Sequence, residues 1–177
     1  DRFRAHMDDL GPDSVELNDI KLMVLGNGRI GKTQIVNRLR GRDYEEDANS
    51  THGVIIAAEQ IEGVSGGPTF NIWDFGGQDI YHGPHALFLK SRAIFLVVWA
   101  KHAEDEDTHS HGGMIFRNRR LSWWLDFVRR YGSATSPLIV LQNMMDIDGD
   151  LGEPEAVKAI RDDIKFDRTQ AYSAASR

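Results

Sequence analysis

The sequence carries, at residues 26–33, the stretch Gly26-Asn27-Gly28-Arg29-Ile30-Gly31-Lys32-Thr33. It matches the pattern GxxxxGK[ST], in which glycines let the backbone turn tightly and aim its N–H groups inward. Those donors, with the start of a helix behind them, form a cradle for anions. Lys32 adds a positive charge for the outer phosphates, and the Thr33 hydroxyl is a hard oxygen ligand suited to Mg²⁺. The stretch therefore predicts a nucleoside triphosphate site, to which we also assign Gln34, but it does not distinguish GTP from ATP.

The segments on either side of this loop have the periodicity that the motif requires. Residues 20–25 form an apolar run that predicts a buried strand, and residues 33–39 place apolar side chains at helical spacing. Later in the chain we expect strands at residues 54–58, 70–73, 93–99, 137–141 and 169–173, and helices at residues 79–90, 117–131 and 154–164. Strands that alternate with helices predict an α/β fold, with a mostly parallel six-stranded sheet and helices on both faces.

The chain is expected to form one domain, since its 177 residues lie within the usual length of a domain. Residues 1–18 are acidic and weakly patterned, so we assign them to a linker and residues 19–177 to the domain. The first residue is not Met, and the chain stops where one more covering helix is expected. We therefore expect a piece of a longer protein, with the final helix of the domain missing.

A second motif, Trp73-Asp74-Phe75-Gly76-Gly77-Gln78, follows a predicted strand. An aspartate at the end of that strand can reach a Mg²⁺ ion bound beside the first strand. Gly77 would offer its backbone N–H to the terminal phosphate. The amide of Gln78 can both accept from and donate to a water molecule, which would orient it for attack in line with the phosphorus. The pattern indicates hydrolysis of the terminal phosphate, with Gln78 and Lys32 as catalytic residues.

A third candidate ligand, Thr51, lies in the polar loop of residues 42–52. A threonine hydroxyl there could complete the Mg²⁺ shell when the terminal phosphate is present. We therefore assign Thr51 to catalysis and, with Thr33 and Asp74, to the metal. Ser50 is the competing residue in this loop.

The loop after the predicted strand 137–141 reads Asn143-Met144-Met145-Asp146 and fits the pattern NxxD. A carboxylate at the edge of the base can accept from both the N1–H and the 2-amino group of guanine, and adenine has no such pair of donors. Asp146 is thus the residue expected to select GTP. Asn143 would tie this loop to the phosphate loop and touch the base.

The last predicted strand ends in Ser173-Ala174-Ala175. Small residues there would let the backbone N–H of Ala174 reach the guanine carbonyl oxygen. Ser173 could brace Asp146.

Composition and charge exclude several other classes. The net charge of −6 disfavours non-specific binding to nucleic acid. The longest apolar run, residues 93–100, is far shorter than the roughly 20 residues that a membrane span needs, so we expect no direct membrane insertion. The absence of cysteine fits a reducing compartment and a cytoplasmic location.

These motifs follow one another in the order and spacing of the Ras-like small GTPases. More narrowly, the sequence resembles the Roc (Ras of complex proteins) domain of Roco proteins over about residues 20–175. The resemblance rests on the motif at residues 73–78, on Tyr81-His82-Gly83-Pro84-His85 and on the expanded segment near residues 101–120.

The resemblance implies a Ras-like P-loop NTPase fold, a GTP/GDP cycle with Mg, and slow intrinsic hydrolysis. It implies nucleotide-sensitive loops near residues 42–54 and 75–90. It also implies a switch role within a larger Roco-type protein, often with leucine-rich repeats upstream, and a homodimer formed through a following COR domain or through the domain itself.

Two positions depart from the pattern of the family. Met144 stands where a basic residue is usual, and Ala175 stands where a lysine is usual after Ser-Ala. Both lysines normally pack around the base, so their absence predicts fast nucleotide exchange without a dedicated exchange factor.

Two rival functions stay open. In one, the domain is a nucleotide-gated dimerisation module with negligible hydrolysis, and in the other it is an ATPase of the wider P-loop class. Trp123, Phe127 and Tyr131 bear on the first, because they form an apolar stripe that is either part of the core or a docking face.

Residues 101–113, rich in histidine and acidic residues, are expected to form a flexible surface loop rather than a metal site, with the acidic run 104–107 in solvent. His82 and His85 are interpreted as surface packing residues. No arginine can be assigned as a finger.

Overall fold

The computed structural model describes residues 19–45, 51, 53–60, 68–76, 92–111, 113–133, 135–149, 154–160 and 166–171. Its strands are β1 (Asp19–Leu25), β2 (Val54–Gln60), β3 (Thr69–Phe75), β4 (Ile94–Trp99), β5 (Thr108–His111), β6 (Met114–Arg117), β7 (Leu138–Gln142) and β8 (Phe166–Ala171). Its helices are α2 (Lys32–Leu39), α4 (Lys101–Asp105), α5 (Leu121–Tyr131), α6 (Met145–Asp148) and α7 (Glu155–Ile160).

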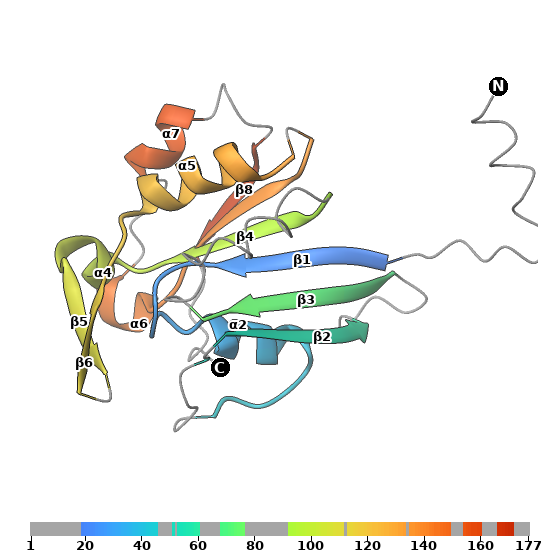
Figure 1. The fold of residues 1–177 in the computed structure, drawn as a ribbon, viewed down its shortest axis with the longest axis horizontal. Helices are drawn as coiled ribbons and strands as arrows, with labels where there is room; N and C mark the ends of the chain where they lie inside the picture. Colours follow the sequence, from blue (N-terminus) through green and yellow to red (C-terminus); the bar gives the residue numbers. More distant parts are fainter. Residues whose placement is uncertain are drawn as a thin grey trace, which may run out of the picture.

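Six strands form one sheet in the order β2-β3-β1-β4-β7-β8 (Figure 1). Strand β2 pairs antiparallel with β3, and every other neighbouring pair is parallel. The carboxyl ends of β1, β3, β4 and β7 therefore meet at one edge of the sheet. In open α/β sheets this edge is where ligands bind. The predicted fold class, a mostly parallel α/β sheet with helices on both faces, is confirmed.

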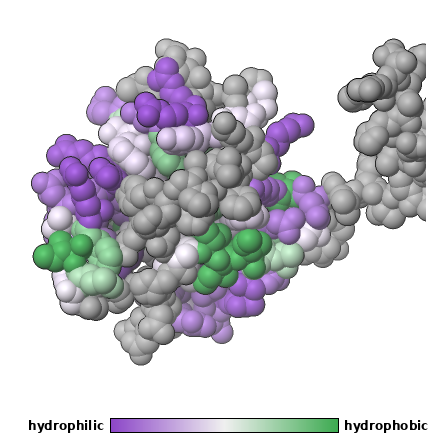
Figure 2. All heavy atoms as spheres, in the orientation of Figure 1, coloured by the Kyte–Doolittle hydropathy of each residue, from purple (hydrophilic) through white to green (hydrophobic). Residues whose placement is uncertain are grey.

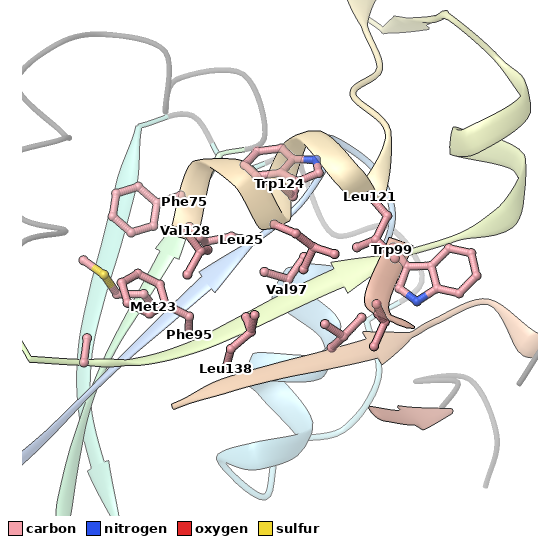
Figure 3. Close-up of a cluster of buried hydrophobic side chains, with 14 residues drawn as sticks. Met23, Leu25, Phe75, Phe95, Val97, Trp99, Leu121, Trp124, Val128 and Leu138 are labelled. Carbon is pink, nitrogen blue, oxygen red and sulfur yellow. The ribbon is translucent and has the colours of Figure 1, made fainter. Parts of the chain in front are cut away.

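Side chains alternate between the two faces of the sheet, and each face has its own core. On one face Met23, Phe95 and Val97 pack against α5 and α7 (Figure 3). On the other face Leu22, Val24, Leu96 and Val98 pack against α2. The central strands β1 and β4 are apolar on both faces because both are covered, as is usual for parallel sheets.

The segment from residue 101 to residue 120 differs from the prediction. The expected loop at 101–113 contains helix α4 and strand β5, and β5 pairs with β6 in a two-stranded hairpin. The expected helix at 117–131 begins only at Leu121, because residues 114–117 belong to β6. Ile115 and Phe116 fit an extended chain. The helical spacing of the apolar residues that follow led the prediction to begin the helix too early.

Hydrogen bonds hold the two ends of this hairpin segment together. The Asn118 N–H donates to the Asp107 carbonyl at 2.8 Å, and the Asn118 side-chain oxygen lies 2.7 Å from Nδ1 of His109. Met114 and Ile115 are exposed on β6, where Figure 2 shows apolar side chains at the lower left.

The stripe formed by Trp123, Phe127 and Tyr131 is half-buried and packs against the core beneath α5. Its rings contact one another along the helix: Trp123 stacks on Phe127 with centroids 5.2 Å apart, and Phe127 and Tyr131 meet at a tilt with centroids 4.9 Å apart. This packing favours the core interpretation of the stripe. Among the described residues, no helix has the length and apolar character needed to cross a membrane.

Candidate nucleotide-binding site

The phosphate loop leaves β1 at Gly26 and enters α2 at Lys32. Gly26 has φ of 138°, and a Cβ atom there would lie 2.2 Å from the Val98 carbonyl oxygen of β4. Gly31 has φ of 81°. Both positions therefore require glycine, because a side chain would meet backbone or side-chain atoms and strain the main chain. At Gly26 the loop therefore lies directly against β4.

Lys32 is buried beneath the loop. Its Nζ donates to the carbonyl oxygens of Gly26 and Asn27 at 3.0 and 2.6 Å. Burial lowers the pKa of Lys32 to about 8, and Asp74 acts in the opposite direction. The ammonium group is thus held at the base of the loop, in a place where an anion would stabilise its charge.

Three side-chain oxygens from distant segments gather beside Lys32. Thr33 Oγ1 donates to Asp74 Oδ2 at 2.6 Å and shares a hydrogen bond with Thr51 Oγ1 at 2.8 Å. Thr51 Oγ1 also lies 3.5 Å from Asp74 Oδ2. The structure thus brings together the three residues that the sequence analysis assigned to the metal.

Asp74 reaches this cluster because of the alternation along β3. Residues 70, 72 and 74 face the side of the sheet that α2 covers, whereas Trp73 and Phe75 face the other core. Burial raises the pKa of Asp74, and hydrogen bonds from Thr33 and Thr51 together with the charge of Lys32 lower it. Its Oδ1 is buried and has no hydrogen-bond partner among the described residues. A buried carboxylate oxygen beside two hydroxyls is a donor set that suits Mg²⁺.

The loop after β7 contacts the phosphate loop directly. Asn143 Nδ2 donates to the Ile30 carbonyl oxygen at 2.7 Å, and a Cβ on Gly31 would lie 2.4 Å from the same nitrogen. The tie that the sequence analysis expected between these loops is therefore present. Asp146 lies on the short helix α6 and is exposed. An exposed carboxylate thus lies three residues after the anchored Asn143.

Met144, the residue in the place of the usual basic one, has φ of 58°. Its half-buried side chain packs against the core that α2 covers. The left-handed conformation starts α6 directly after Asn143.

Gln34 has a different set of contacts. Its side-chain amide pairs with the main chain of Glu45, since Nε2 donates to the Glu45 carbonyl oxygen and Oε1 accepts from the Glu45 N–H. The side chain thus ties α2 to the loop that begins at residue 42. Any contact between Gln34 and a nucleotide would therefore have to be made by the main chain of Gln34.

Sequence reasoning missed two contacts near the site. The side chain of Asn27 bonds to the main chain of Arg119 and to the indole of Trp124. Glu104 Oε1 accepts from the Leu121 N–H at 2.6 Å and so caps α5 from another helix. Glu104 is half-buried, so the acidic run 104–107 is not entirely in solvent as expected. A buried tryptophan needs an acceptor and a helix start needs a cap, but no sequence pattern names the partner.

Several assigned residues lie outside the described part of the chain, namely Gly77, Gln78, Ser173 and Ala174, together with Ser50, His82, His85 and the segments 1–18 and 79–90.

The sheet order and the phosphate loop after its first strand define the chain as a P-loop domain of the Ras-like class. A family profile described as "Ras of Complex, Roc, domain of DAPkinase" matches residues 21–146, and the chain belongs to this Roc family of Ras-like GTPase domains.

Two relatives illustrate the setting of such domains. A Roc-COR-CHAT protease of Runella zeae is 30% identical over an alignment of 147 residues, which covers 74% of this chain and 15% of the relative. The probable serine/threonine-protein kinase roco5 of Dictyostelium discoideum is 33% identical over 96 residues, which make up 54% of this chain and 3% of the relative. The chain thus spans a small part of either relative.

A solved structure is also similar. The Methanosarcina barkeri Roco2 RocCORdC structure bound to GDP aligns with a TM-score of 0.69 at 25% identity. The alignment covers 92% of this chain and 47% of that chain.

Proposed function

We propose that this domain binds GTP and GDP together with Mg²⁺ and hydrolyses GTP to GDP and phosphate. The observation that carries the proposal is the convergence of Thr33, Thr51 and Asp74 beside the buried Lys32. These residues come from α2, the loop before β2, and β3, so no local structural need explains why they meet.

The phosphates would lie on the N–H groups of the loop, at the start of α2. The proposed contacts come from Gly26, Asn27, Gly28, Arg29, Ile30, Gly31, Lys32, Thr33 and Gln34. A helix start favours negative charge, and anionic phosphates would offset the cost of burying the Lys32 ammonium group.

Mg²⁺ would be held by Thr33 and Asp74, with Thr51 joining when a terminal phosphate is present. Once bound, the ion would neutralise charge on the phosphate oxygens. Removal of one hydroxyl or of the carboxylate would take away a protein oxygen that supports the ion.

The base would lie between the loop after β7 and the last strand. Asp146 would accept from the two guanine donors, the backbone N–H of Ala174 would reach the guanine carbonyl oxygen, and Ser173 would brace Asp146. Support for this arrangement comes from the bond that holds Asn143 against the phosphate loop. It fixes the base-reading loop at the side of the phosphate cradle.

Hydrolysis would depend on Gln78, which would orient the attacking water, and on Gly77, whose N–H would contact the terminal phosphate. Positioning and electrostatic stabilisation supply most of the catalysis in such reactions. Without an arginine supplied from elsewhere, turnover is expected to be slow.

In a longer protein the domain would act as a nucleotide-dependent switch and would dimerise through a following COR domain. The Runella zeae Roc-COR-CHAT protease and the Methanosarcina barkeri Roco2 RocCORdC structure both combine Roc with COR by name, which supports this setting.

Calorimetry of the intact protein with GDP, GTP and ATP tests the proposal. Binding of both guanine nucleotides, with ATP at least about 100-fold weaker, is expected because adenine lacks the two donors that the Asp146 carboxylate would accept from. Asp146→Asn should remove this preference, and Asp126→Asn on the exposed side of α5 is the matched control. Equal affinity for ATP would favour the ATPase alternative. Binding without measurable turnover would leave a nucleotide-gated interaction module.

A further inference from the structure

Asn27 lies in the phosphate loop, but its side chain is directed toward helix α5. The residue is 5% exposed. Its Nδ2 donates to the Arg119 carbonyl oxygen at 2.7 Å, and its Oδ1 accepts from the Arg119 N–H at 2.9 Å. The same Oδ1 accepts from the Trp124 indole N–H at 3.1 Å. Three hydrogen bonds therefore join the loop to a segment more than 90 residues away in the sequence.

The contact requires a side chain that both donates and accepts. The Asn27 amide pairs with both main-chain groups of Arg119, much as a neighbouring strand would. A carboxylate would face the Arg119 carbonyl oxygen without a proton to donate, and alanine would leave buried groups unpaired. The contact thus explains the presence of asparagine at a position that the loop motif leaves open.

The main chain of Asn27 faces the other way. Its carbonyl oxygen accepts from Nζ of Lys32 at 2.6 Å. A displacement of residue 27 would therefore move one of the two main-chain acceptors that hold this lysine. One residue connects the proposed phosphate-binding lysine with α5.

The far side of the contact is anchored at two places. Trp124 is buried in the core beneath α5 (Figure 3). Just before the helix, the Asn118 N–H donates to the Asp107 carbonyl at the base of the β5–β6 hairpin. Residues 118–124 are thus held both by the hairpin and by the core, so they can transmit a displacement to the loop.

We infer that Asn27 is a positioning residue that couples the phosphate loop to helix α5 and to the β5–β6 hairpin. The inference rests on the proposed function, because Asn27 acts on nucleotide affinity through the position of the loop and of Lys32. The side chain does not read the nucleotide itself. By reciprocity, a partner that shifts α5 or the hairpin changes nucleotide affinity by the same factor by which the nucleotide changes affinity for that partner.

The test is a double-mutant cycle on the intact protein, with Asn27→Ala, Trp124→Phe and both together. The readout is the dissociation rate of GDP that carries a fluorescent methylanthraniloyl group. Trp124→Phe removes the indole N–H and with it the hydrogen bond to Asn27. It should therefore speed GDP dissociation about five-fold, which corresponds to the free energy of one neutral hydrogen bond. The same substitution should have little effect in the Asn27→Ala background, because the acceptor is already gone. Ser122→Ala, at an exposed position of α5, is the control and should dissociate at the wild-type rate.

Hydrogen exchange measured by mass spectrometry over residues 118–128 supplies a second readout. GDP should slow exchange there in the wild type and in Ser122→Ala, and much less in Trp124→Phe. This readout and the Trp124→Phe rate decide the matter if Asn27→Ala does not fold. A wild-type dissociation rate for Trp124→Phe, or additive effects in the cycle, would overturn this inference but would leave the proposed function standing. A wild-type protein that fails to bind the labelled GDP would overturn the proposed function.

Discussion

The side-chain amide of Asn143 donates to the main-chain carbonyl oxygen of Ile30 at 2.7 Å, although 113 residues separate the two in the sequence. Both residues are buried. The bond joins the loop after β7 to the loop after β1. The Asn143 amide group therefore helps to fix the position of the proposed base-reading loop relative to the phosphate loop.

Asn143→Asp keeps the shape of this side chain but removes the donor. A carboxylate would face the Ile30 carbonyl oxygen, so the free energy of unfolding should fall by about 2 kcal/mol. Urea unfolding without nucleotide measures the loss. Asn118→Asp is the matched control, because Asn118 Nδ2 donates to the Glu106 carbonyl oxygen at an exposed place. Equal losses of unfolding free energy in the two variants would show that the bond to Ile30 stabilises the fold no more than an exposed hydrogen bond does.

Gly31→Ala tests the same junction from the other side. An added Cβ would lie 2.4 Å from Asn143 Nδ2, whereas a Cβ on Gly149 would meet nothing within 4 Å. Both glycines have positive φ, so both substitutions strain the backbone. Gly149 also has ψ of 174°, outside the left-handed helical region that Gly31 occupies, so stability alone does not separate the two variants. Only Gly31→Ala should weaken GDP binding, as measured by calorimetry, because only its Cβ displaces the Asn143 side chain. A Gly149→Ala protein that loses as much affinity for GDP would contradict this prediction.

Asp74→Asn separates folding from metal binding. Burial raises the pKa of Asp74, so a neutral amide should not lower the free energy of unfolding measured without metal. Affinity for GDP should fall when EDTA removes Mg²⁺ from the wild type, and this dependence should disappear in Asp74→Asn. Calorimetric titrations with Mg²⁺ and with EDTA provide the comparison. A variant that keeps the full response to Mg²⁺ would exclude Asp74 as a metal-supporting residue.

Glu104 caps α5, and its substitution should depend on pH. Burial raises the pKa of Glu104, against the hydrogen bond from the Leu121 N–H and the charges of Arg120 and Lys101. A carboxyl group with a raised folded-state pKa stabilises the fold more below its unfolded value of 4.5, and this contribution is lost as pH rises through the folded-state pKa. Glu104→Gln keeps an acceptor without a charge, so it should be tolerated at pH 7.

Glu104→Ala removes the acceptor and should cost about 1 kcal/mol at pH 7. The difference in unfolding free energy between wild type and Glu104→Gln should shift in favour of the wild type as pH falls from 7 toward 4.5. Urea unfolding at several pH values measures it. A shift in the opposite direction would rule out the raised pKa.

Gln78→Leu tests the proposed chemistry. Loss of the amide should slow single-turnover GTP hydrolysis at least about 10-fold, because the attacking water is no longer oriented. Affinity for GDP should change little, since the side chain is proposed to act on the water. An unchanged hydrolysis rate would show that another group positions the water.

The sheet and the residues around the phosphate loop were predictable because their signals are local. An apolar run followed by a glycine-rich turn and a lysine specifies a strand, a loop and a helix within about 20 residues. Period-two alternation along β3 then places Asp74 on the face of the sheet that carries Thr33. The meeting of Thr33 and Asp74 follows from these two facts, whereas Thr51 reaches them from the loop before β2.

The segment between β4 and α5 was not predictable in the same way. Helix α4 has only five residues, and β5 and β6 have four each, so no periodicity can develop in any of them. Their positions depend on long-range bonds such as Glu104 to Leu121 and Asn27 to Arg119. Many polar residues in the sequence could make such bonds, and only the folded chain selects the partners.

The pairing of Ile30 with Asn143 also constrains how the protein is made. The glycine-rich loop leaves the ribosome more than 100 residues before the amide that closes it, and β4 must be inserted between β1 and β7 before the two can meet. Such non-local pairing slows folding. A nucleotide that binds only the completed site would stabilise the folded domain and would not guide the early steps of folding. Nucleotide in the cell would therefore favour newly made domains that have completed folding.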